Sequence, residues 1–201
     1  MGQANRSERA CEKIAEAAGQ GAELVVFLEA WVAGYPYSRE GWESSLEHWI
    51  PVRIRSYDNA LLIASEDTDR LCQAVARANF HVVLGCNEMD PRRGVHTIYN
   101  TLLFIEGSGK ILGRHRKTMP TFVERAVWGW GHGSNLVSYE TDIGRIGAGR
   151  QRPSDDAHPR PYDRAGRRFP RGGLPGGLCA AHRPQSWRSP IGKNNSSGTT
   201  A

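Results

Sequence analysis

Apolar side chains recur three and four residues apart in two segments of the chain, which is the spacing of an amphipathic helix. The first segment runs from Glu8 to Gln20 and is followed by glycine, a common helix stop. The second is predicted to begin at Asp67 or Thr68, either of which can cap a helix, and to end near Asn79.

Five other segments have the composition of strands, at residues 24–28, 81–85, 98–105, 110–115 and 136–139. The first two are almost unbroken apolar runs, which are typical of strands buried on both faces. The third and fourth are joined by Gly107-Ser108-Gly109, which predicts a hairpin turn. Because strands and helices alternate early and hairpins follow, we predict an α/β protein with a mixed sheet.

This pattern stops at Gly147. Residues 148–201 hold seven of the 11 prolines but only six large apolar or aromatic side chains. Such a segment cannot bury enough apolar surface to offset its chain entropy, so we predict that it is disordered. The chain is therefore divided into a partial domain at residues 1–147 and an Arg-, Pro- and Gly-rich tail at residues 148–201.

The tail is rich in amino acids whose codons are GC-rich, namely Arg, Gly, Pro and Ala. A GC-rich reading frame that is translated out of phase has this composition. Our hypothesis is that the chain from about residue 148 onward comes from a frameshift, a retained intron or a mis-joined gene model, which the nucleotide sequence would decide.

The excess of positive over negative charge lies in the tail. The whole chain has a formal net charge of +5 and a pI near 9.2. Residues 150–201 hold ten of the 26 Lys and Arg and three of the 21 Asp and Glu, which leaves 16 basic and 18 acidic residues in 1–149. A basic-tailed nucleic-acid binder is therefore a less favoured alternative, and no nucleic-acid partner is expected.

Other features of the composition bear on location and cofactors. The four cysteines have no paired spacing, and the N-terminus has no apolar signal segment, so we expect free thiols in a cytoplasmic protein. No apolar run reaches the length of about 18 residues that a membrane span needs. The seven histidines are scattered without metal-ligand spacing, so no metal is expected.

Two stretches place charged residues directly after predicted strands. Glu29 lies in Leu24-Val-Val-Phe-Leu-Glu-Ala-Trp-Val-Ala-Gly-Tyr-Pro36. Lys117 and Glu124 lie in Arg116-Lys-Thr-Met-Pro-Thr-Phe-Val-Glu-Arg-Ala-Val-Trp-Gly129. Together these stretches resemble the nitrilase (carbon–nitrogen hydrolase) superfamily, and its nitrilase and cyanide-hydrolysing branch in particular. The resemblance covers residues 10–147.

The resemblance implies an α-β-β-α sandwich, of which this chain would supply an incomplete version, in a family whose members form homo-oligomers. It implies hydrolysis of a small-molecule nitrile to a carboxylic acid and ammonia, without a metal or organic cofactor. Glu29 would be a general base, and Lys117 would hold positive charge near the reaction intermediate. Glu124 would orient the lysine or the substrate.

The residues by themselves leave simpler alternatives open. Glu29 could be a solvated turn residue and Lys117 a surface lysine in a basic cluster. Glu124 could form an ion pair with Arg125 or Arg116 on a short helix.

The nucleophilic cysteine of the family is missing from the position where the resemblance places it. The family pattern puts this cysteine shortly after a Gly-Arg-Ile-Gly segment, here Gly144–Gly147, and the matching residue is Gln151. Cys86 has the character of a packed residue at a strand end, and Cys179 lies in the tail. We therefore predict that the chain is an inactive hydrolase, with a non-catalytic fragment or binding-only remnant as the alternative.

The predicted tail can be tested by limited trypsin digestion. Nine arginines lie between residues 150 and 201, and an unfolded backbone exposes them all to the protease. Cleavage is therefore expected first from Arg150 onward, followed by mass spectrometry of the fragments. A tail fragment that survives as long as residues 1–147 would contradict the prediction.

Overall fold

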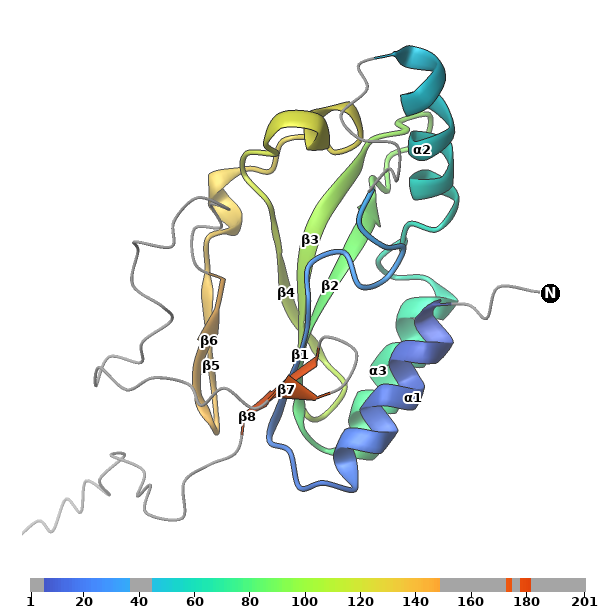
Figure 1. Cartoon of the computed structure of the whole chain (residues 1–201). Coiled ribbons are helices and arrows are strands. Elements are labelled where there is room, and N and C mark those ends of the chain that lie inside the picture. The colour runs from blue at the N-terminus through green and yellow to red at the C-terminus, as the bar shows by residue number, and fades with distance from the viewer. Residues whose placement is uncertain (1–5, 37–44, 149–172, 175–177, 182–201) are drawn as a thin grey trace, which may run out of the picture.

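The computed structural model describes residues 6–36, 45–148, 173–174 and 178–181 (Figure 1). Its helices are α1 (Arg6–Ala18), α2 (Leu46–Asp58) and α3 (Glu66–Ala78), with two 3-10 helices, η1 (Phe122–Ala126) and η2 (Gly133–Asn135). Its strands are β1 (Leu24–Phe27), β2 (His81–Met89), β3 (Ile98–Ile105), β4 (Ile111–Arg116), β5 (Ser138–Thr141), β6 (Gly144–Gly147), β7 (Gly173–Leu174) and β8 (Leu178–Ala181). The predicted α/β class is confirmed.

Six strands form one mixed sheet in the order β4-β3-β2-β1-β8-β7. β1 and β2 run parallel, because α2 and α3 carry the chain back between them. β2 pairs antiparallel with β3 from Val82↔Ile105 to Met89↔Ile98, and β3 turns into β4 at the predicted glycine turn. β4 is therefore an edge strand of this sheet.

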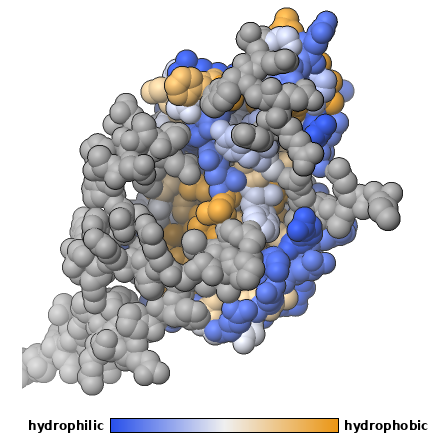
Figure 2. All heavy atoms as spheres, in the orientation of Figure 1, coloured by the Kyte–Doolittle hydropathy of each residue, from blue (hydrophilic) through white to orange (hydrophobic). Residues whose placement is uncertain are grey.

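The two faces of the sheet are covered by different layers (Figure 1). On one face, Phe27 and Leu84 pack with Ile14 of α1 and Leu71 of α3 in the main apolar core. Figure 2 shows the hydrophilic outer surface of these helices at the lower right. On the other face, the β5–β6 hairpin packs on the sheet, with the ring centroids of Phe104 and Tyr139 5.2 Å apart.

The layers are therefore helices, a first sheet and a second small sheet. Within the described residues no helix covers the outer side of β5 and β6, whose residues alternate between exposed and half-buried. This is the incomplete α-β-β-α sandwich that the family resemblance implies.

Helix α2 is the main element that the apolar pattern did not predict. Three of its large apolar side chains, at Leu46, Ile50 and Ile54, are exposed, so the pattern does not mark a buried face. Pro51 lies inside the helix, where it lacks the N–H of an intrahelical bond. The start is instead set by Ser45, whose side chain accepts a hydrogen bond from the His48 N–H.

The predicted boundaries need three smaller corrections. Ser65 occupies the N-cap position of α3, while Thr68 lies in the first turn and donates to the Leu62 carbonyl. β2 continues to Met89, because its polar end pairs with β3. β5 begins at Ser138, two residues later than the predicted start at residue 136, and pairs with β6. Asn79 ends α3 in the left-handed conformation, as predicted for the helix stop.

The predicted disorder of residues 148–201 falls mostly outside the described residues. The exceptions include β7 and β8, which no apolar pattern had indicated. β8 pairs antiparallel with β1, with Leu24 opposite Ala181, and β7 pairs with β8. The free edge of β1 offers backbone donors and acceptors that a short segment can pair whatever its side chains are. Among the described helices, none combines the length and apolar character needed to cross a bilayer.

Candidate active site

Glu29 lies in a bulge at the end of β1. The last Cα pair of β1 and β2 is Val26↔Val83, an offset of 57 residues, and pairing resumes at Val32↔Cys86, an offset of 54. Three residues are therefore looped out of the strand, and Glu29 is in the loop.

Gly85 of β2 allows the bulge to lie against the sheet. A Cβ atom at this position would be 2.0 Å from the Leu28 carbonyl oxygen and 3.0 Å from the Cα of Glu29. The Val32 N–H donates to the Gly85 carbonyl at 3.1 Å, which holds the far end of the bulge. Only glycine leaves room for this backbone to cross, so Gly85 sets the position of Glu29.

Lys117 directly follows the edge strand β4. Its backbone N–H donates to the Asn100 carbonyl at 2.7 Å, and its own carbonyl accepts from the Gly131 N–H at 2.9 Å. A Cβ on Gly131 would lie 2.7 Å from that carbonyl oxygen, so the approach again requires glycine. The Lys117 side chain is only 3 % exposed, in contrast to the surface lysine that a basic cluster would suggest.

The structure brings together the three charged residues that the sequence singled out. The Lys117 Nζ donates to Glu29 Oε1 and to Glu124 Oε1, each at 2.8 Å. Asn100 of β3 also donates its side-chain amide to Glu29 Oε1. One buried ammonium therefore joins the β1 bulge, the end of β4 and the 3-10 helix η1.

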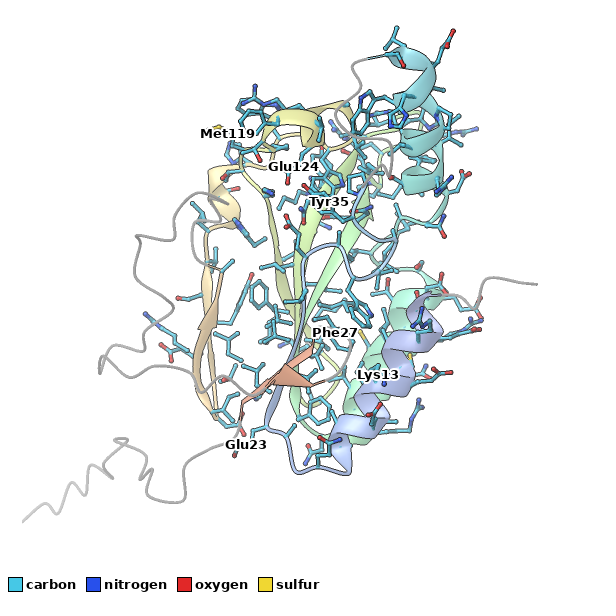
Figure 3. All side chains as sticks on the ribbon, viewed as in Figure 1. Lys13, Glu23, Phe27, Tyr35, Met119 and Glu124 are labelled. Carbon is cyan, nitrogen blue, oxygen red and sulfur yellow. The ribbon has the colours of Figure 1, made fainter. Side chains whose placement is uncertain are left out.

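Glu124 is held by a second set of contacts. Its Oε1 also accepts from the Tyr35 hydroxyl at 2.7 Å, and Figure 3 shows these two side chains close together at one end of the sheet. Its Oε2 accepts from the Thr121 N–H at 2.7 Å and from the Thr121 hydroxyl at 3.1 Å, which forms a capping box for η1. Arg125 and Arg116, the partners expected on a short helix, instead bind the Pro120 carbonyl and another carboxylate.

These contacts decide the charges within the cluster. Burial disfavours the ammonium form of Lys117, but its hydrogen bonds to Glu124 and Glu29 outweigh burial and raise the Lys117 pKa. Burial likewise disfavours ionised Glu124, but hydrogen bonds from Lys117, Thr121 and Tyr35 outweigh it and lower the Glu124 pKa. Burial and the Glu124 carboxylate raise the pKa of Tyr35, so its hydroxyl stays a donor.

The two carboxylates differ in what they can still do. Glu124 is 4 % exposed and accepts two hydrogen bonds on each oxygen, so its capacity is used. Glu29 is 28 % exposed, and both its contacts go to Oε1. Within the described residues Glu29 Oε2 accepts no hydrogen bond, so this oxygen is open to a proton from a substrate or water.

Aromatic side chains line the cluster. Trp128 is buried, and its ring centroid lies 5.6 Å from the Lys117 ammonium and 5.3 Å from the Tyr35 ring centroid. The Trp128 Nε1–H donates to the Asn87 side chain at 3.0 Å, and the Asn87 amide donates to the Gly34 carbonyl. The ring is therefore fixed in orientation between the cation and the Gly-Tyr-Pro turn.

Several contributors to this cluster were not identified from the sequence. Asn100 and Asn87 are polar residues inside buried strands, a combination that marks hydrogen bonding and could have been noticed. Thr121 and Tyr35 lay in the quoted stretches without an assigned role, and Gly85 showed no signal because its importance depends on a distant backbone.

Cys11, Cys72 and Cys86, the cysteines whose side chains the structure describes, make no contact with this cluster among the described contacts. Cys86 is fully buried in the core beneath the helices, and burial raises its pKa, which disfavours a thiolate. Gln151, the position matched to the family nucleophile, lies outside the described residues. Within the part of the chain that the structure describes, no group of three His, Cys, Asp or Glu side chains could hold a metal ion.

The carbon-nitrogen hydrolase family model matches residues 3–149. This chain belongs to the carbon–nitrogen hydrolase family. It is similar to Nitrilase 2 from an unknown prokaryotic organism, at 40 % identity over 141 residues, which cover 70 % of this chain and 44 % of that protein. It is 38 % identical over 144 residues to the bifunctional nitrilase/nitrile hydratase NIT4A of Lupinus angustifolius, covering 70 % of this chain and 40 % of the relative.

The fold is also that of a nitrilase-superfamily structure. Saccharomyces cerevisiae Nit3, a member of branch 10 of that superfamily, matches with a TM-score of 0.53 and 21 % identity, over 72 % of this chain and 49 % of Nit3. The chain therefore spans less than half the length of each of these relatives.

The role of Gly85 predicts the effect of a single methyl group. Gly85→Ala is expected to lower the free energy of unfolding by about 1–3 kcal/mol, because its Cβ overlaps the Leu28 carbonyl. Gly19→Ala is the control, since its nearest contact would be an ordinary 3.6 Å. Urea titration of both variants measures the difference, and equal midpoints would refute the close approach.

The lowered pKa of Glu124 predicts a pH dependence of stability. A group with a depressed folded pKa stabilises the protein above its unfolded pKa, and this contribution is lost as pH falls through the folded value. At pH 7, Glu124→Gln is expected to cost about 1.5–3 kcal/mol relative to the wild type. The gap should shrink below pH 4.5, the ordinary value for this group.

Glu140→Gln is the matched control, because Glu140 forms a pair with Arg145 while its side chain is 72 % exposed. It is expected to change stability by no more than about 0.5 kcal/mol. A Glu124→Gln gap that persists unchanged to pH 2 would contradict the ionic role.

Proposed function

We propose that the Glu29–Lys117–Glu124 cluster is the acid–base and charge-stabilising part of a nitrilase-type site that acts on small-molecule nitriles. One observation carries the proposal. Lys117 is held 2.8 Å from two carboxylates, of which only Glu29 keeps an oxygen without a partner among the described residues. The relatives named nitrilase and bifunctional nitrilase/nitrile hydratase support the choice of nitriles over amides.

The reaction proposed for this site begins with a thiolate. The sulfur bonds to the nitrile carbon while the nitrogen takes up a proton, which gives a thioimidate. Water adds to the same carbon and ammonia leaves with the protons it needs, and a second water releases the carboxylic acid from the thioester. Each step therefore moves a proton at one place and develops charge at another.

The geometry suits each residue to one of these tasks. Glu29 accepts the thiol or water proton on its open Oε2 and returns it to the departing nitrogen. Lys117, anchored by Glu124, supplies a fixed positive charge where the nitrogen and oxygen become negative. Glu124, whose oxygens are fully used, orients Lys117 and takes no proton itself.

The nucleophile is the part that this chain does not supply at the family position, where Gln151 stands. A glutamine side chain cannot add to a nitrile carbon as a thiolate does. We therefore propose that the chain as written has the lineage of a nitrile hydrolase but does not turn over nitriles. A binding-only remnant is the second candidate function, and it rests on the same substitution.

Ammonia release tests both statements. The purified chain is expected to release no ammonia from aliphatic or aromatic nitriles above a heat-killed control. Turnover that survives Cys86→Ala and Cys179→Ala but is lost in Glu29→Gln would show that another nucleophile acts with this cluster.

In a second arm, residues 10–147 are fused to the cysteine-containing half of a nitrilase relative. This chimera is expected to hydrolyse nitriles. In it, Glu29→Gln and Lys117→Ala should each lower kcat/KM by about 10³-fold, with a smaller loss for Glu124→Gln. Full activity in Lys117→Ala would refute the assigned role of the lysine.

A further inference from the structure

A second charged network lies on the opposite face of the sheet from the Glu29–Lys117–Glu124 cluster. Glu88 of β2 is completely buried, with no exposed surface. Its Oε1 contacts Arg116 Nη2 and, at 2.8 Å, Arg114 Nη1. Its Oε2 accepts from Arg116 Nε at 2.9 Å and from the Thr101 hydroxyl at 2.8 Å. A buried carboxylate is tolerated only when it is satisfied in this way.

These contacts link strands that are not neighbours. Glu88 stands opposite Tyr99 of β3, whereas Arg114 and Arg116 belong to β4, on the far side of β3. The guanidinium of Arg116 also lies 3.8 Å from the centre of the Tyr99 ring, so it is held from two directions. Glu88 therefore connects β2 to the edge strand across the strand between them.

The register of this edge strand is not determined by its hairpin alone. The pairing of β3 with β4 is irregular between Phe104 and Ile105, where Phe104↔Gly113 is followed by Ile105↔Ile111. This irregularity shifts the pairing of the rest of β4 by one residue relative to the pair next to the turn. A slip of one residue would turn every side chain beyond the bulge to the other face.

We propose that Glu88 is the positioning residue for Lys117. Because it holds Arg114 and Arg116 on one face of β4, the next residue, Lys117, must turn toward the other face, where Glu29 lies. This proposal about Glu88 rests on the proposed function for the role of Lys117. Its test reads the position of the amine and needs no turnover, so either proposal can fail without the other.

The test is trace acetylation of the native chain with acetic anhydride, followed by mass spectrometry of each lysine. Lys117 is 3 % exposed and paired, whereas Lys13 on α1 is 36 % exposed and serves as the internal reference. In the wild type, acetylation of Lys117 should be slower than that of Lys13 by a factor of at least about ten. Glu88→Gln keeps the shape but leaves two cations unpaired, and it should raise the relative rate for Lys117 by about tenfold.

Two variants separate positioning from a general loss of stability. Val75→Ala removes buried side-chain volume from the apolar core cluster, of which Glu88 is not a member, and should leave the labelling of Lys117 unchanged. Arg92→Met breaks a pair with Asp90 near the same end of β2 without touching Glu88, and should also leave it unchanged. The proposal fails if Val75→Ala exposes Lys117 as much as Glu88→Gln does.

The proposal also fails if the Glu88→Gln variant folds and protects Lys117 from acetylation as strongly as the wild type does. Should Glu88→Gln not fold, Arg114→Met takes its place, since this arginine is 36 % exposed and supplies only one contact to Glu88. That variant should raise the labelling of Lys117 several-fold relative to Arg92→Met, and no rise would overturn the proposal.

Discussion

A buried ammonium ion must be compensated, and much of this structure follows from burying the one on Lys117. Its two carboxylate partners lie 88 residues earlier and seven residues later in the chain. Glu29 reaches Lys117 because of the bulge after β1, which needs glycine at position 85. Bringing the second requires the η1 turn, which Glu124 itself caps through Thr121. The same carboxylate therefore neutralises the cation and fixes the local backbone that presents it.

The edge strand β4 carries charge to both faces of the sheet. Arg114 and Arg116 reach the buried Glu88 on one side, and Lys117 reaches Glu29 and Glu124 on the other. Burying cations on both sides of an edge strand makes a shift in register costly, because each slipped charge would lose its partner. The position of Lys117 is therefore coupled to ionic contacts on the opposite face of the sheet.

The charged cluster and the position matched to the family nucleophile lie in different parts of the chain. Glu29, Lys117 and Glu124 all come from the segment that matches the carbon–nitrogen hydrolase family model, residues 3–149. The position that the family resemblance matches to the nucleophile follows β6 in the sequence and is Gln151. The described part thus holds the charged cluster, and the position matched to the nucleophile lies outside it.

Most of the local elements, and the three charged residues of the cluster, could be predicted from short stretches of sequence. Unbroken apolar runs marked β1 and β2, glycine and asparagine marked turns and helix ends, and the context of Glu29, Lys117 and Glu124 marked the site. These are signals carried by neighbouring residues, so no distant contact is needed to read them.

Other features follow only from contacts between distant parts of the chain. These contacts leave Glu29 Oε2 without a hydrogen-bond donor among the described residues, require glycine at position 85, and compensate the charge of Glu88. The pairing of β8 with β1 was likewise set by neighbours in space. Each of these depends on groups far apart in sequence that share one buried, low-dielectric volume. There a missing partner or an extra methyl group is costly, and no local pattern of residues records that cost.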